Sequence, residues 1–196
     1  MIKIAINGEK LDFKIENEKT IGDVMGEVEE FCNSQNNTVF SIFSNEREIK
    51  GEEIDKLFAL PVTEELSIEL FTKSGDDIKE QVMEIGKDLT DISMSLEEIP
   101  VKMQTGDDAF AISVIEKFSQ KFVQLCRYLS LHKISGISVE TKIDGQAVQD
   151  YQKEISELLT DITTALEEKD IISVGDIAEY ELSPLAKKLG NGLISL

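Results

Sequence analysis

The spacing of hydrophobic residues along the chain changes near residues 72–75. Before this point, apolar and polar residues alternate in short runs bounded by turn residues, a pattern typical of strands. After it, apolar residues recur every three or four positions to the end of the chain, a pattern typical of helices. The change predicts an α+β protein with a sheet domain at residues 1–73 and a helical domain at residues 76–196.

The N-terminal pattern predicts the order strand, strand, helix, strand, short helix, strand. Ile2, Ile4 and Ile6 alternate with other residues before an Asn7-Gly8 turn, which favours a hairpin. The remaining predicted elements are a strand with Leu11, Phe13 and Ile15, a helix capped by Thr20 and Asp23, a strand in which Phe40 and Ile42 share a face, a short helix at 52–60 that ends at Pro61, and a strand with Leu66, Ile68 and Leu70.

This order and spacing resemble those of ubiquitin-like β-grasp domains over residues 1–73, and residues 20–28 carry the apolar positions of that family's central helix. The resemblance implies a β-grasp fold, which hosts carriers, modifiers and adaptors. Covalent modifiers and sulfur carriers of the family need a free carboxy-terminal Gly-Gly. Here the domain ends Phe71-Thr72-Lys73-Ser74-Gly75 and continues into a helix, and the chain ends at Leu196. We therefore expect neither a modifier nor a sulfur carrier.

Two phenylalanines are expected on the open face of the predicted sheet. If Ile42 points inward, Phe43 points outward, and if Ile68 and Leu70 point inward, Phe71 joins it. Burying a phenylalanine is worth about 1.5–3 kcal/mol, so such a pair needs cover. The short connection favours docking of the helical domain onto this patch. The alternative is that the patch binds another protein.

The C-terminal pattern predicts four antiparallel helices and resembles a generic up-and-down four-helix bundle. The expected segments are Ile78 to Ile99, ended or bent by Pro100; a helix capped by Gly106-Asp107 and ended by Ser135-Gly136; Val148 to Leu166; and a helix with a capping box at residues 173–176, a kink or restart at Ser183-Pro184 and a stop at Gly190-Asn191. The loop at residues 138–145 has room for one short strand.

The net charge of −19 divides into −8 through Ser74, from 8 basic and 16 acidic residues, and −11 after it, from 12 and 23. This acidity argues against nucleic-acid and membrane partners. No apolar run approaches the roughly 20 residues that cross a bilayer, and the start reads as a strand, not as a signal peptide. Cys32 and Cys126 are expected to be reduced thiols, so we expect a cytoplasmic protein. The Lys, Glu, Ile and Asn-rich usage suggests a bacterial one.

Two sets of side chains are candidates for binding. Tyr128, Tyr151 and Tyr180 are interface candidates or residues at the rim of the core. Asp150, Glu154, Glu157 and Asp161 share one helix face, which is either an acidic docking stripe or a solvated face near the lysines of the preceding helix. A di-iron bundle would need Glu-x-x-His pairs, and the chain has only His132, so we expect no metal.

The sequence shows no glycine-rich phosphate loop, nucleophile elbow or Cys-x-x-Cys, so no catalytic residue or cofactor is expected. The prediction is a non-enzymatic adaptor that presents the β-grasp domain and the acidic bundle to a protein partner. One alternative is a bacterial export or assembly chaperone that holds a partner helix. Another is an enzyme with an unrecognised site. A homodimer is also possible.

Overall fold

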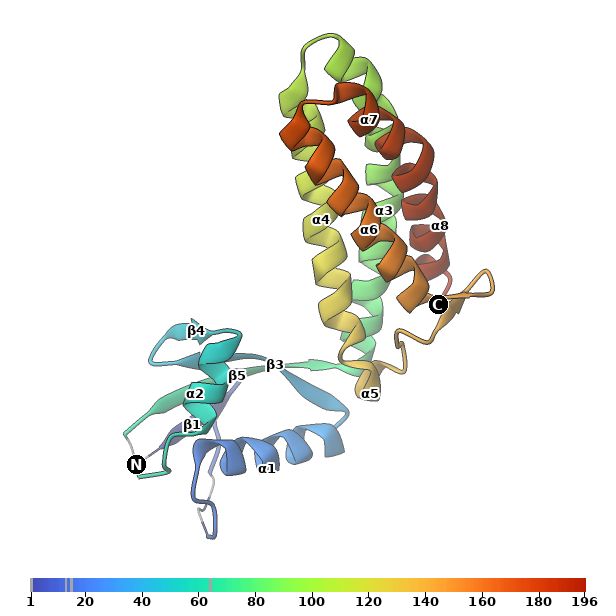
Figure 1. The fold of residues 1–196 in the computed structure, drawn as a ribbon. Coiled ribbons are helices and arrows are strands. Elements are labelled where there is room, and N and C mark those ends of the chain that lie inside the picture. The colour runs from blue at the N-terminus through green and yellow to red at the C-terminus, as the bar shows by residue number, and fades with distance from the viewer. Residues whose placement is uncertain (1, 13, 15, 64) are drawn as a thin grey trace. The chain divides into compact units, whose positions relative to one another are not determined.

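The computed structural model describes residues 2–12, 14, 16–63 and 65–196. Contacts divide the chain into two compact units, Met1–Asp77 and Ile78–Leu196. The protein is α+β, because the first unit holds a mixed sheet and the second is mainly helical (Figure 1).

The sheet of the first unit has the strand order β2-β1-β5-β3-β4. Its strands are β1 (Lys3–Ile6), β2 (Glu9–Lys10), β3 (Asn37–Ser44), β4 (Arg47–Ile49) and β5 (Ser67–Ser74). The first and last strands, β1 and β5, lie side by side and are parallel, with Ile4 opposite Ile68 and Ile6 opposite Leu70. The other pairings are antiparallel.

Helices α1 (Ile21–Ser34) and α2 (Glu52–Phe58) share their core with one face of this sheet. Helix α1 begins with the predicted capping box, in which Thr20 Oγ1 accepts from the Asp23 N–H and Asp23 Oδ2 accepts from the Thr20 N–H. Its apolar stripe packs on the sheet. The shared core consists of Ile4, Ile21, Val24, Met25, Val28, Cys32, Leu57, Ile68 and Leu70.

Two tight hairpins shape the sheet. Asn7 and Gly8 both have positive φ, as the predicted two-residue turn requires. Asn45 and Glu46 form a second turn of this kind, with φ of 49° and 68°, and they create strand β4, which the sequence analysis missed. The strand predicted around Leu11 is shorter than expected, because β2 covers only Glu9–Lys10, and Phe13 and Ile15 lie outside the described residues.

A register shift in β3 corrects the predicted position of Phe40. The shift lies between Val39 and Ser41, and both Val39 and Ile42 pack against the core although they are three residues apart. A bulge allows this spacing because it adds one residue to one strand of the pair. Phe40 therefore does not share the core face with Ile42, as simple alternation predicted.

The second unit contains long helical segments that run alongside one another in alternating directions (Figure 1). They are α3 (Gly75–Gln104), α4 (Asp108–Leu129), α6 (Val148–Glu168) and a continuous segment formed by α7 (Ile171–Asp176), the π-helix η1 (Ile177–Leu182) and α8 (Ser183–Ile194). The connection between α4 and α6 holds α5 (His132–Ser135) and the hairpin of β6 (Lys142–Ile143) and β7 (Gln146–Ala147). The second helix therefore ends earlier than predicted, and the loop holds two short strands where one was expected.

Close helix packing explains why Gly190 does not end the last helix as predicted. A Cβ atom at Gly190 would lie 2.5 Å from Thr90 Oγ1 and 2.6 Å from the Gly86 carbonyl oxygen. One at Gly86 would lie 2.8 Å from the Gly190 carbonyl oxygen. The two glycines thus allow the backbones of α3 and α8 to approach closely, and α8 continues to Ile194.

Pro100 was predicted to end or bend the first helix, and it does not end it, because it lies inside α3, which continues to Gln104. Proline has no backbone N–H, so it removes one hydrogen bond of the helix. Here the loss falls only four residues before the end of α3. Its ring also packs on α7, since a Cβ atom at Gly175 would lie 3.2 Å from Pro100 Cβ. The predicted capping box at residues 173–176 is replaced by Asp170, whose carboxylate accepts from the Ser173 N–H and hydroxyl.

The predicted restart at Ser183-Pro184 takes the form of a π-helix. Ser183 donates its N–H to the Ala178 carbonyl, five residues back, and α8 then begins with proline in its first turn. The Ser183 side chain is buried and lies close to the Ser93 carbonyl oxygen, at 2.9 Å, and to Glu97 Oε1, at 3.1 Å. These contacts hold the junction against α3. Within the described part of the chain, no helix is both long and apolar enough to cross a membrane.

Candidate protein-binding surfaces

The face of the sheet opposite α1 carries a pair of phenylalanine rings. Leu70 and Ile68 point into the core, so alternation places Phe71 on the other face of β5. Phe43 lies on that face of the neighbouring strand β3, and the two ring centroids are 5.3 Å apart at 74°, an edge-to-face arrangement. Phe71 remains 38% exposed. The sequence-predicted pair is therefore brought together.

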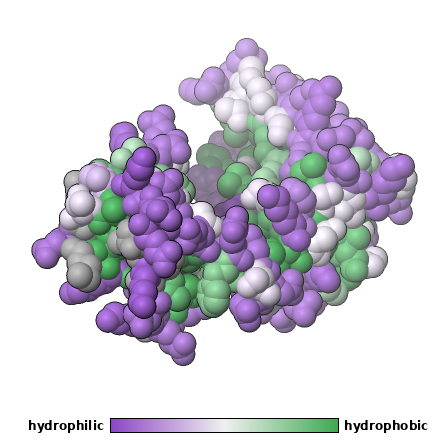
Figure 2. Space-filling model, turned by 90° about the horizontal axis from the view of Figure 1, so that it is seen from below, coloured by the Kyte–Doolittle hydropathy of each residue, from purple (hydrophilic) through white to green (hydrophobic). Residues whose placement is uncertain are grey.

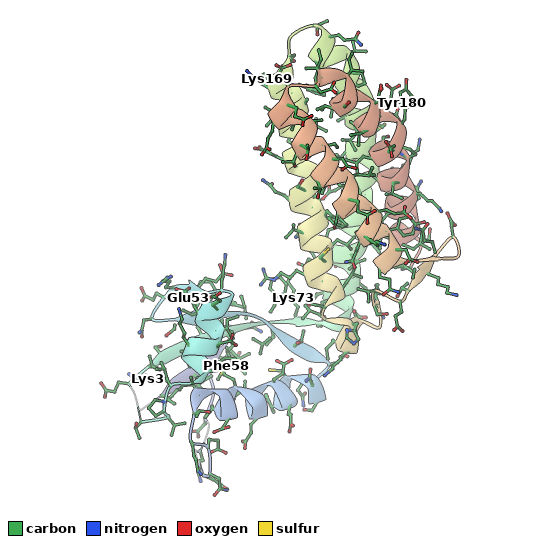
Figure 3. The ribbon with its side chains drawn as sticks, in the orientation of Figure 1. Lys3, Glu53, Phe58, Lys73, Lys169 and Tyr180 are labelled. Carbon is green, nitrogen blue, oxygen red and sulfur yellow. The ribbon has the colours of Figure 1, made fainter. Side chains whose placement is uncertain are left out.

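Phe40 and Lys73 extend this aromatic pair along β3 and β5. The Lys73 ammonium lies 5.0 Å from the centroid of the Phe40 ring, within cation–π distance. Lys73 projects from the C-terminal end of β5 (Figure 3). The sequence analysis missed Phe40, because only the bulge in β3 moves it out of the core. We refer to Phe40, Phe43, Phe71 and Lys73 as the sheet-face patch.

Charged residues accompany the sheet-face patch. Glu69 and Glu48 lie in register with Phe43 on the strands that flank it. Glu48 is paired with Lys50 at 2.7 Å, and both groups are partly exposed. Exposed pairs of this kind contribute about 0–1 kcal/mol, so their main effect is to surround the rings with polar groups. An apolar centre with a charged surround is typical of protein-binding surfaces.

The second candidate surface is a groove of about 470 Å³ in the helical unit. Glu154, Glu157, Leu158 and Asp161 line it from α6, and Glu181 and Leu185 line it from η1 and α8. Three of the four predicted acidic-face residues thus face this groove, whereas Asp150 is exposed outside it. We refer to these six lining residues as the acidic groove. The sequence analysis did not identify Glu181 as part of this surface.

The lysines of α4 do not neutralise the acidic groove. Lys121 pairs with Asp88 of α3 at 2.6 Å, and Lys117 lines a smaller groove of about 220 Å³ between α3 and α4. Nearer the acidic groove, Gln146 donates to Glu154 Oε1 at 3.0 Å, and Lys153 lies 4.0 Å from Glu157. Asp161 and Glu181 have no ion pair among the residues that the structure describes.

The three tyrosines differ in exposure. Tyr151 is fully buried and donates its hydroxyl to the Ile143 carbonyl at 3.3 Å, while Lys188 lies 5.4 Å from its ring centroid. Tyr128 is buried and its hydroxyl contacts Gln81 Oε1 at 3.3 Å. Tyr180 is 66% exposed and projects outward from η1 (Figure 3). The neighbouring Glu179 carboxylate raises the pKa of Tyr180, so its hydroxyl is neutral at physiological pH. Only Tyr180 therefore offers an accessible ring.

Burial raises the pKa of both cysteine thiols. Cys32 lies in the core of the first unit. The Cys126 sulfur accepts a hydrogen bond of 3.1 Å from Gln152 Nε2, which lowers the pKa of this thiol by less than burial raises it. A raised pKa keeps both sulfurs in the unreactive thiol form. In the described ranges, no group of three or more His, Cys, Asp or Glu side chains is arranged to hold a metal ion.

Figure 2 shows one face of the protein, on which hydrophobic side chains form patches between hydrophilic ones. Scattered apolar residues are normal on protein surfaces, so the sheet-face patch is distinguished by the contact between its rings.

Comparison with known proteins assigns each half of the chain. Residues 2–74 match the TP0873 N-terminal domain, and residues 80–192 match the domain of unknown function DUF8042. A protein of Treponema pallidum (strain Nichols) that carries the name "Uncharacterized protein" is 37% identical over 193 residues, which cover 98% of this chain and 96% of that protein. No solved structure matches the chain. The chain, in which a TP0873 N-terminal domain is followed by a DUF8042 domain, therefore belongs to the family of this Treponema pallidum protein.

Proposed function

We propose that the protein is a non-enzymatic adaptor that binds a protein partner through the sheet-face patch of a ubiquitin-like β-grasp domain. The fold part of this proposal is supported by the strand order β2-β1-β5-β3-β4, the parallel β1–β5 pair and the packing of α1 on one face. We also propose that the helical unit is an up-and-down four-helix bundle, which the alternating directions of its long segments support.

The observation that carries the proposal is the edge-to-face pair of Phe43 and Phe71 on a face that no described helix of its own unit covers. Aromatic side chains dominate the energetics of protein interfaces because they bury a large area at a small entropic cost. Water contact with Phe71, which is 38% exposed, is unfavourable, and an apolar partner would relieve it.

The proposal is tested with tagged full-length protein recovered from cells of its native host. Wild type, Phe71→Asp and Phe31→Asp are compared by quantitative mass spectrometry of what co-purifies. Phe31 is the matched control, because it is also an exposed phenylalanine, at 52%, but it lies on α1 and not on the sheet face. We expect at least one abundant companion whose recovery falls about tenfold in Phe71→Asp and stays near wild type in Phe31→Asp. Equal recovery from all three would overturn the proposal.

A further inference from the structure

We propose that the acidic groove binds a basic amphipathic helix of a protein partner. This surface belongs to the helical unit and uses no residue of the sheet-face patch, so it stands independently of the proposed function. Its six residues come from segments that are adjacent in space, with α6 on one side and the η1–α8 junction on the other.

The apolar part of the acidic groove has the dimensions of a helix contact. Residues 154 to 161 of α6 span about 10 Å at about 1.5 Å per residue, or two turns. Leu158 lies in the middle of this span and Leu185 faces it from α8, and both side chains are only half-buried. A partner helix that presents apolar residues at i and i+3 or i+4 would place them on these two leucines.

The charges around the leucines select a cationic partner. Four carboxylates line the acidic groove and no lysine or arginine does. Two neighbouring lysines are partly engaged, since Lys153 lies 4.0 Å from Glu157, and the Lys188 ammonium lies 5.4 Å from the Tyr151 ring centroid. Asp161 and Glu181 keep no ion pair among the described residues, so lysines flanking the apolar face of a bound helix would meet unpaired carboxylates. A second copy of this chain, with a net charge of −19, is a poor occupant by the same reasoning.

The η1–α8 junction forms one side of this groove. Glu181 belongs to η1 and Leu185 to α8, and the junction between them is fixed by Pro184 and by the Ser183 contacts to Ser93 and Glu97. The side of the groove opposite α6 is therefore anchored to α3 and is preformed. A preformed groove binds without the entropic cost of ordering its walls.

The test uses the full chain and a fluorescently labelled synthetic peptide of about 18 residues, with leucines at helical spacing on one face and lysines beside them. Binding is followed by fluorescence anisotropy at physiological ionic strength. The triple variant Glu157→Gln, Asp161→Asn, Glu181→Gln should bind about tenfold more weakly than wild type. The control triple variant Glu80→Gln, Asp108→Asn, Glu116→Gln has the same net charge and should stay within about twofold. Its three positions are exposed and lie outside the groove.

Two further comparisons separate the groove from general attraction to an acidic protein. A peptide of the same composition, scrambled so that its leucines share no face, should bind at least about tenfold more weakly. Phe71→Asp should bind the peptide as wild type does, and methyl NMR signals of Leu158 and Leu185 should shift on binding. The inference is overturned by the absence of saturable binding, by equal losses in the two triple variants, by equal binding of the scrambled peptide, or by loss of binding in Phe71→Asp.

Discussion

The two units bury their apolar residues in different ways. The sheet of the first unit is covered by helices on one face, so its inner residues, such as Leu70, are fully buried while Phe71 on the other face is not. The helical unit places its apolar stripes between helices and brings α3 and α8 together through glycines. The comparison teaches that a sheet covered by helices on one face only leaves its other face available for binding. In the helical unit, the acidic groove lies beside the η1–α8 junction, where the last helical segment departs from regularity, whereas the smaller groove lies between α3 and α4.

The largest expected effect comes from breaking the close α3–α8 contact. Gly190→Ala should destabilise the helical unit by about 3 kcal/mol, because the new Cβ would press on Thr90 and on the Gly86 carbonyl, and backbone cannot move aside cheaply. Thermal unfolding followed by tyrosine fluorescence reports on this unit, since the chain has no tryptophan and its three tyrosines all lie there.

The matched control for Gly190→Ala is Gly26→Ala in α1 of the first unit, which holds no tyrosine, so its stability is followed by amide hydrogen exchange in α1. A Cβ atom at Gly26 would meet nothing within 4 Å, so alanine should stabilise α1 by about 0.5–1 kcal/mol through its helix propensity. If both substitutions changed the free energy of unfolding by the same sign and size, the contrast between the tightly packed Gly190 and the unobstructed Gly26 would be wrong.

A smaller effect is expected at the helix caps. Thr20→Ala should destabilise the first unit by about 1 kcal/mol, because it removes the side-chain acceptor of the capping box of α1. Asp107→Ala should cost the helical unit about as much, since Asp107 also accepts one cap bond, from the Phe110 N–H at 3.3 Å, against 3.2 Å for the bond that Thr20 accepts. Amide hydrogen exchange in α1 and α4 measures both. A loss at one cap more than about twice the loss at the other would contradict the assignment of one comparable bond to each.

The smallest effect is a dependence of the first unit's stability on pH through Asp23. Hydrogen bonds from the Thr20 and Lys19 backbone N–H groups lower the pKa of Asp23 below its ordinary value of 3.8. A lowered pKa in the folded state means that the stabilisation is present above the ordinary pKa and is lost as the pH falls through the folded-state pKa.

Asp23→Asn removes this titration and is the way to measure it. Urea unfolding of the first unit should show wild type more stable than Asp23→Asn near neutral pH, with the difference shrinking at about pH 3 and below. A difference that grew on acidification would contradict the assigned direction of the pKa shift.

The sequence predicted the change from sheet to helix and most elements, because these follow from local periodicity and from caps such as Thr20 and Asp107. It failed where contacts distant in the chain decide the outcome. Gly190 reads as a helix stop, but its lack of a side chain serves the contact with Gly86, and Phe40 reads as a core residue until the bulge in β3 moves it.

The candidate sites divide in the same way. The pairing of Phe43 with Phe71 follows from alternation on two strands, so it could be predicted from the sequence. The acidic groove could not, because Glu181 and Leu185 join Glu154, Glu157 and Asp161 only through the packing of α6 on the last helical segment. Tyr151 was a candidate for an interface because its side chain is amphipathic, but it is fully buried in the core.

The most direct test of the sheet-face patch is photo-crosslinking from its centre. Phe71→p-benzoylphenylalanine, introduced into the tagged full chain in its native host, places a reactive ketone on the half-exposed ring. After irradiation, the adaptor proposal predicts a discrete crosslinked product that joins this residue to one other protein. Crosslinks only to residues of the helical unit, Ile78–Leu196, would contradict it and would assign the patch to docking between the two units.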